Sequence, residues 1–206
     1  DTSRLLLAKD KWPDIDMQLA VNCIESRRKL KGKVNEWHDN HSLIFPVRLS
    51  AEQCSSSATA QYKASLADRI MAGGEWKIAD LTGGLGVDSW FFSQKAEKVL
   101  YNEMQTVLCD SSRHNFKALG ADNIEVSNAA VGNSADETSP SALLGDFRPD
   151  IIYMDPARRG EGGRKVFLIE ECTPDILTLK EELFTISRHI LVKLSPMADI
   201  SMACGR

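Results

Sequence analysis

From Lys77 onward, short apolar segments alternate regularly with helix-forming segments, and this pattern constrains the fold more than any other feature. The apolar segments have the length and composition of buried strands. Strands that alternate with helices form parallel βαβ units with right-handed crossovers. We therefore predict an α/β fold with a doubly wound, Rossmann-like parallel sheet. The strands are expected at residues 77–81, 98–101, 124–126, 150–154 and 189–193.

The first part of the chain has a different pattern. Apolar residues recur at three- and four-residue spacing, which predicts an N-terminal helical region over residues 1–48. Pro13 is expected at a fresh helix start, where an amide is not needed. Residues 49–206 are assigned to the Rossmann-like domain. Because the chain starts at Asp1 rather than Met and stops soon after the fifth strand, we expect this domain to be truncated at its C-terminal end.

Composition narrows the class of protein. The chain has 206 residues, 43% of them hydrophobic, so it can bury a sizeable core. Its apolar runs are far shorter than the roughly 20 residues that cross a bilayer, and no signal segment opens it. The five cysteines are widely spread and form no CxxC pair, which argues against a zinc site. We expect a cytoplasmic protein with reduced thiols, no metal and no membrane association.

The charge pattern leaves open whether the chain contacts nucleic acid. The balance of 25 basic and 29 acidic residues gives a net charge of -4, which does not indicate a globally basic nucleic-acid binder. A local cluster of basic residues nevertheless occupies residues 27–33. It can be the solvated C-terminal end of a helix, where cations are favourable, or it can contact a phosphate backbone.

The strongest motif is IADLTGGLGVD at residues 78–88. A strand that ends in an acid runs into a glycine turn and then into a helix, whose N-terminus favours a negative group such as a ligand carboxylate. Glu103 follows the second strand, 20 residues after Gly83, the spacing at which an acid receives ribose hydroxyls. The motif predicts a nucleotide-like ligand; the alternative is a purely structural tight turn.

A second motif, YMDPARRG at residues 153–160, ends the fourth strand. Pro156 stiffens the backbone, so that neighbouring carbonyls and Asp155 can act as fixed acceptors for an amine. Arg158 and Arg159 can hold a phosphate through paired hydrogen bonds. The alternative is a surface loop whose arginines pair with nearby glutamates. The predicted catalytic residues are Asp155, Pro156 and Arg158.

These two motifs resemble those of class I S-adenosylmethionine-dependent methyltransferases, over roughly residues 50–196. DLTGGLG at residues 80–86 is similar to that family's first motif, with Thr82 in place of the usual first glycine. DPAR at residues 155–158 resembles the Asp-Pro-Pro-aromatic motif of amino-methyltransferases and the Asp-Pro-Pro-Arg motif of RNA 5-methyluridine methyltransferases. Together with LSAEQCSS at residues 49–56, the motifs resemble a group of bacterial methyltransferases that carry a C-terminal THUMP-like domain, which implies an RNA substrate.

The resemblance implies S-adenosylmethionine as the cofactor and assigns roles by position. The glycines would line its methionine part, the acid after the first strand would contact its amino group, and the acid after the second strand would hold the ribose. Residues after the third strand would border the adenine, and the residues near position 56 would close the site. The predicted cofactor-binding residues are Ser56, Thr59, Asp80, Thr82, Gly83, Gly84, Gly86, Asp88, Glu103, Met104, Asn128 and Ala129.

The chain departs from these families in two places. No aromatic residue follows the Asp-Pro pair, so a base could stack only on another ring, such as Tyr153 or Phe167. The 5-methyluridine reaction needs a nucleophilic cysteine after the fifth strand, where this chain has Lys193 to Pro196. Because Cys204 is too far along the chain to substitute, we reject that mechanism.

The expected function is methyl transfer to RNA, at a base nitrogen of tRNA or rRNA. A direct displacement needs mainly alignment of the nucleophile with the methyl group. One alternative is an NAD(P)-dependent oxidoreductase, although Ser89 stands where its fingerprint wants a small Gly or Ala. Another is a non-catalytic protein that binds the cofactor and interacts with RNA.

Overall fold

A computed structural model describes residues 2–157 and 172–194. These residues form a five-stranded parallel sheet with the strand order β3-β2-β1-β4-β5. The order reverses between β1 and β4, which creates the topological switch point where α/β sheets bind ligands. The predicted strands are confirmed, each end within one residue. Their bounds are β1 (Lys77–Asp80), β2 (Lys98–Asn102), β3 (Ile124–Ser127), β4 (Ile151–Met154) and β5 (His189–Val192).

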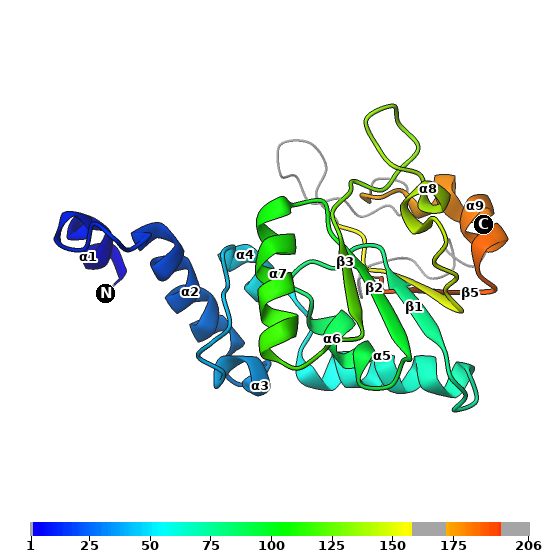
Figure 1. Ribbon diagram of the computed structural model, residues 1–206, viewed down its shortest axis with the longest axis horizontal. Helices are drawn as coiled ribbons and strands as arrows, with labels where there is room; N and C mark the ends of the chain where they lie inside the picture. The colour runs from blue at the N-terminus through cyan, green and yellow to red at the C-terminus, as the bar shows by residue number, and fades with distance from the viewer. Residues whose placement is uncertain (1, 158–171, 195–206) are drawn as a thin grey trace.

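Helices cover both faces of the sheet (Figure 1). One face packs on α5 (Ser57–Ile70), α6 (Val87–Ser93) and α7 (Thr106–Ala118). The other packs on α8 (Pro140–Leu144) and α9 (Ile176–Ile186). Because side chains alternate along a strand, Tyr153 belongs to the first core and Ile152 to the second.

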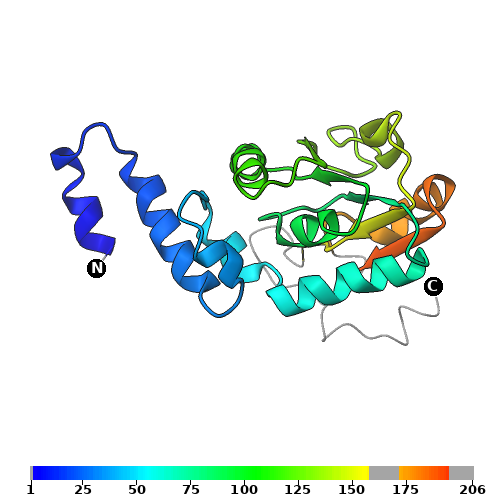
Figure 2. The ribbon, with the colours of Figure 1, turned by 60° about the horizontal axis from the view of Figure 1, so that its bottom comes forward.

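The N-terminal region is helical, as predicted. It contains α1 (Thr2–Leu7), the 3-10 helix η1 (Lys9–Lys11), α2 (Met17–Leu30) and α3 (Asn35–His38). Helix α4 (Arg48–Gln53) begins at the last residue of this region. Figure 2 shows α1 and α2 extending away from the body of the molecule. The prediction that Pro13 starts a helix is wrong. Helix α2 begins at Met17 because the Asp16 carboxylate accepts a hydrogen bond from the Leu19 amide at 2.9 Å and caps the helix.

The basic cluster of residues 27–33 mainly holds this region together. The Arg27 guanidinium donates hydrogen bonds to four backbone carbonyls of residues 37–43 and lies over the ring of Phe45. Lys33 donates to the carbonyls of Ala51 and Glu52, and Lys29 pairs with the Glu52 carboxylate. Contacts within the fold therefore account for three of these basic side chains.

The second half of the N-terminal region shares its core with the sheet. Leu30, Trp37 and Phe45 are fully buried and belong to the same core as Ile78 of β1. In contrast, α1 buries none of its residues. Within residues 2–157 and 172–194, none of the helices combines the length and the apolar character that a membrane crossing requires.

Candidate functional site at the carboxyl ends of the strands

The glycine turn and Glu103 meet at the carboxyl ends of β1 and β2. The Gly83 amide donates to the Asn102 carbonyl at 2.7 Å, and the Gly84 amide donates to Glu103 Oε2 at 2.9 Å. Glu103 Oε1 accepts from the Gln105 amide at 2.9 Å. The structure thus brings together the turn and the acid that the sequence paired by spacing alone.

Asn102, which the sequence analysis missed, ties three strand ends together. Its buried side-chain amide donates to the carbonyls of Leu81 and Ala129 at 3.1 and 3.0 Å, and its Oδ1 accepts from the Ala129 amide. A single asparagine at the end of a strand gives no sequence signal of this role. The segment after β3 is thereby held beside the glycine turn.

The predicted adenine-side residues lie at this same edge. The Asn128 side chain donates to the carbonyls of Glu103 and Met104 and accepts from the Thr106 hydroxyl. Met104, which directly follows Glu103, is 59% exposed. The edge therefore presents an exposed apolar side chain next to a carboxylate.

Packing explains two of the three glycines. A Cβ atom at Gly83 would lie 2.1 Å from Cε2 of Tyr101, and a Cβ atom at Gly86 would lie 2.7 Å from Cζ of Phe116. Gly86 also has a positive φ of 92°, which disfavours other residues. Gly84 differs: its φ is also positive, at 55°, but a Cβ atom there would meet only the Thr82 carbonyl oxygen, at an ordinary contact distance of 4.0 Å. The alternative of a purely structural tight turn, which the sequence left open, therefore accounts for Gly83 and Gly86.

Asp80 is fully buried and is bound within the protein. Its carboxylate accepts hydrogen bonds from the Ser89 hydroxyl at 2.6 Å and from the Thr82 amide at 3.1 Å. Burial raises the pKa of Asp80 to about 7, because a charged carboxylate is poorly solvated there. Its contact with a cofactor amino group stays a prediction.

Asp155 and Thr82 join the second motif to the first. The Asp155 amide donates to Thr82 Oγ1 at 2.6 Å, and Asp155 Oδ2 accepts from Lys193 Nζ at 2.5 Å. Thr82, which replaces a glycine of the resembling family, thus connects the loops after β1 and β4. Pro156 follows Asp155 in this loop, whereas Arg158, Arg159 and Phe167 lie outside the described residues.

A buried quartet of Ser55, Lys63, Asp88 and Tyr153 lies on the α5 side of β1 and β4. Lys63 Nζ donates to Asp88 Oδ2, Ser55 Oγ and the Tyr153 hydroxyl at 2.5, 2.8 and 2.9 Å. Burial lowers the pKa of Lys63 and raises that of Tyr153. Among the described residues, Asp88 Oδ1 has no hydrogen-bond partner although it is buried.

The quartet changes the expected roles of several residues. Tyr153 is 1% exposed, so the suggestion that its ring stacks on a base is wrong: the ring lies against Phe92 in the core. Ser56 caps α5 by accepting from the Thr59 amide at 3.2 Å, and the two hydroxyls are hydrogen-bonded. Ser56 is therefore the N-cap of α5, and its part in closing the site stays a prediction.

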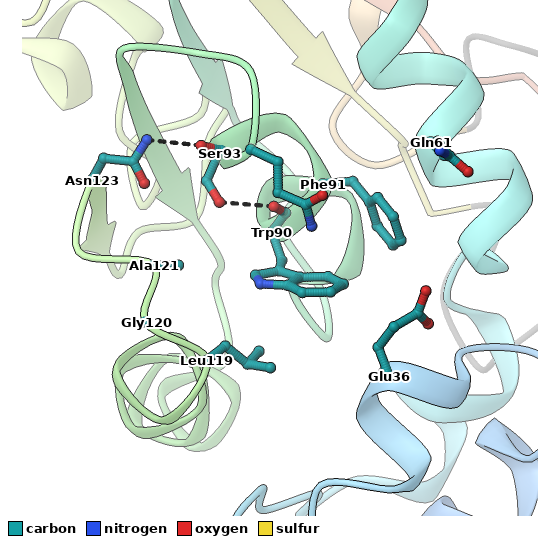
Figure 3. Close-up of a pocket in the computed structure, with 10 residues that line it drawn as sticks. Glu36, Gln61, Trp90, Phe91, Ser93, Leu119, Gly120, Ala121 and Asn123 are labelled. Carbon is teal, nitrogen blue, oxygen red and sulfur yellow. Dashed lines mark hydrogen bonds between the residues drawn. The ribbon is translucent and has the colours of Figure 1, made fainter.

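A cavity of about 500 Å³ lies elsewhere in the molecule (Figure 3). It is lined by Glu36 and Gln61 from the helical layers, by Trp90 of α6, and by the segments that precede β2 and β3. These segments place it at the amino ends of the strands, away from the glycine turn. Among the described residues, no cluster of three or more His, Cys, Asp or Glu side chains could hold a metal ion.

Comparison with solved structures supports the fold. A proposed methyltransferase from Porphyromonas gingivalis W83 is 33% identical over 97% of this chain, with a TM-score of 0.72. The alignment covers 46% of that protein, so this chain spans less than half of its length. Together with the strand order, this similarity shows that the chain has the class I methyltransferase fold.

Two further structures are less similar. A proposed RNA methyltransferase from Pyrococcus horikoshii is 19% identical, over 68% of this chain and 61% of that one, with a TM-score of 0.44. A SAM-dependent methyltransferase from Aquifex aeolicus is 20% identical, over 64% and 61%, with a TM-score of 0.43. No protein-family model and no curated protein matches the chain.

Proposed function

We propose that this chain is an S-adenosylmethionine-dependent methyltransferase that acts on RNA, at a base nitrogen. One observation carries the proposal: the glycine turn, the Glu103 carboxylate and the Asp155-Pro156 segment converge at the switch point between β1 and β4. Ligands of open α/β sheets bind at this place. The 33% identity to the Porphyromonas gingivalis protein supports the same class of activity.

The residues present fit such a cofactor. Each Glu103 oxygen accepts one backbone amide, and a carboxylate oxygen can accept a second hydrogen bond, so Glu103 can still receive the two ribose hydroxyls. No atom lies closer than 4.0 Å to the Cβ position of Gly84, and the exposed Met104 side chain can lie against the adenine. The cofactor, when bound, supplies an electrophilic methyl group.

The residues of the chain itself position the acceptor nitrogen. Asp155 Oδ2 is held by Lys193, and its other oxygen can accept a hydrogen bond from the acceptor nitrogen. Such a bond aims the nitrogen lone pair at the methyl group, and alignment of this kind accounts for much of the rate of a bimolecular displacement. We assign Arg158 to a phosphate near the acceptor, as the motif predicts.

The motifs, and the kind of acceptor they suit, support an RNA substrate. An Asp-Pro segment at the end of β4 offers acceptors for an N–H group, which nucleobases carry. Asp155 is 33% exposed on its side chain, so an acceptor can reach it. Selectivity for one base and one RNA would depend on further contacts.

Calorimetry and a transfer assay test the proposal. We expect binding of S-adenosylmethionine and S-adenosylhomocysteine but not of NAD, and loss of that binding in Glu103→Ala. We also expect transfer of labelled methyl groups to total RNA from a strain that lacks the gene, and a strong reduction by Asp155→Ala with cofactor binding retained. Binding of NAD alone would support the oxidoreductase instead, and cofactor binding without any transfer would support the non-catalytic protein.

A further inference from the structure

Lys193 and Asp155 form an ion pair across the ends of two neighbouring strands. Met154 of β4 pairs in register with Val192 of β5, so the next residues, Asp155 and Lys193, stand opposite each other. The Lys193 amide donates to the Met154 carbonyl at 2.9 Å, which extends the ladder by one bond. The pair therefore rests on a fixed backbone on both sides.

Asp155 is held at two atoms. Thr82 Oγ1 accepts from its amide at 2.6 Å, and Lys193 Nζ donates to its Oδ2 at 2.5 Å. Among the described residues, no hydrogen bond reaches Oδ1. The Thr82 contact fixes the backbone of Asp155, and the Lys193 contact fixes its carboxylate through Oδ2.

The pair contributes little to the stability of the fold. The side chains of Lys193 and Asp155 are 31% and 33% exposed, and ion pairs with this much solvent contact are worth little. An effect of Lys193 on the reaction can therefore be separated from an effect on folding.

We propose that Lys193 is a positioning residue for methyl transfer, which acts by holding the Asp155 carboxylate with Oδ1 aimed at the acceptor nitrogen. This inference rests on the proposed function. Lys193 touches no reacting atom. It removes rotational freedom from Asp155 before the acceptor arrives, and a misplacement of about 1 Å at such a group can slow a reaction by up to about 100-fold.

The test compares Lys193→Met and Lys193→Arg with a matched control, Lys95→Met. Lys95 pairs with Asp68 at 3.3 Å, and their side chains are 37% and 33% exposed, so this pair has nearly the same solvent contact. It lies outside the proposed site. All variants are made in the full chain and assayed with labelled S-adenosylmethionine and total RNA from a strain that lacks the gene.

We expect Lys193→Met to lower kcat by about 10- to 100-fold while the Kd for S-adenosylhomocysteine stays within about twofold and the melting temperature stays unchanged. Lys193→Arg should recover much of the rate, because a guanidinium also donates to a carboxylate, and Lys95→Met should match the wild type. In an Asp155→Asn background, Lys193→Met should have no further effect.

The failures can be told apart. A wild-type chain that binds no S-adenosylmethionine, or transfers no methyl group, overturns the proposed function and this inference with it. An active wild type with an equally active Lys193→Met overturns the inference alone. So does a Lys193→Met variant that loses S-adenosylhomocysteine binding, or one that slows the Asp155→Asn enzyme further.

Discussion

The substitution Gly83→Ala tests why a glycine stands at this position of the turn. The new Cβ atom would lie 2.1 Å from Cε2, 2.3 Å from Cδ2 and 2.7 Å from Cζ of Tyr101. Two contacts prevent the Tyr101 ring from moving aside. The ring is fully buried against Phe116 at a centroid distance of 5.4 Å, and the Tyr101 hydroxyl donates to the Gly84 carbonyl at 2.6 Å.

The expected cost follows from these contacts. Overpacking of a dense core costs about 1–3 kcal/mol, and displacing the Tyr101 hydroxyl from its acceptor adds about 1 kcal/mol. We therefore expect Gly83→Ala to lower the free energy of unfolding by about 2–4 kcal/mol, and the melting temperature by roughly 5–15 °C for a domain of this size. Urea unfolding followed by circular dichroism measures the first quantity, and calorimetry the second.

Two further variants sharpen the test. Gly120→Ala is the control, because Gly120 has a φ of 68° but open space beside it, so only backbone strain of about 1–2 kcal/mol is expected. Adding Tyr101→Leu to Gly83→Ala should cost less than the sum of the two single changes. If Gly83→Ala is as stable as the wild type and loses only cofactor affinity, the glycine serves the ligand and our explanation by packing is wrong.

Three other changes probe buried charge. Because the pKa of Asp80 is raised from 3.8 to about 7, the folded state binds the Asp80 proton more tightly than the unfolded state does. The free energy of unfolding should therefore fall as the pH rises from about 4 to 7. Urea unfolding at several pH values should show this slope in the wild type and not in Asp80→Asn. Lys63→Met leaves Asp88 buried without its cation and should cost about 3–5 kcal/mol, of which the double variant Lys63→Met/Asp88→Asn should recover a large part. Arg27→Lys should lower the free energy of unfolding by about 2 kcal/mol through lost bonds to backbone carbonyls, whereas Arg28→Lys, at an exposed position, should match the wild type.

The strands of the sheet could be predicted from the sequence because the pattern that identifies each strand lies within the strand and the residues next to it. Each buried strand is a short apolar segment such as residues 151–154, and each is bounded by turn residues that mark its ends. The strand order was not predicted: right-handed crossovers leave few arrangements, and the structure shows that the chain adopts β3-β2-β1-β4-β5. The start of α2 was misplaced because Pro13 and Asp16 both give helix-start signals, and only the hydrogen bond to Leu19 decides between them.

Apart from the pairing of the glycine turn with Glu103, the polar contacts of the site could not be predicted because their partners are distant in sequence. Lys63 and Tyr153 are 90 positions apart, and Lys63 lies on a helix, where a lysine usually faces water. Lys193 and Asp155 are 38 positions apart. Their pairing depends on the register of β4 and β5, which the sequence alone does not specify.

The charges at the carboxyl ends of the strands connect these contacts to the proposed cofactor. Within residues 2–157 and 172–194, four acids lie there (Asp80, Asp88, Glu103 and Asp155), against the two lysines at positions 63 and 193. Each lysine is paired with one acid, and Asp80 near pH 7 is partly neutral, so among these six residues Glu103 supplies most of the excess negative charge. That excess suits a ligand with a positively charged sulfonium, because opposite charges attract most strongly where water is partly excluded. The demethylated product has lost that positive charge, so the same field that favours binding of the cofactor also favours release of the product.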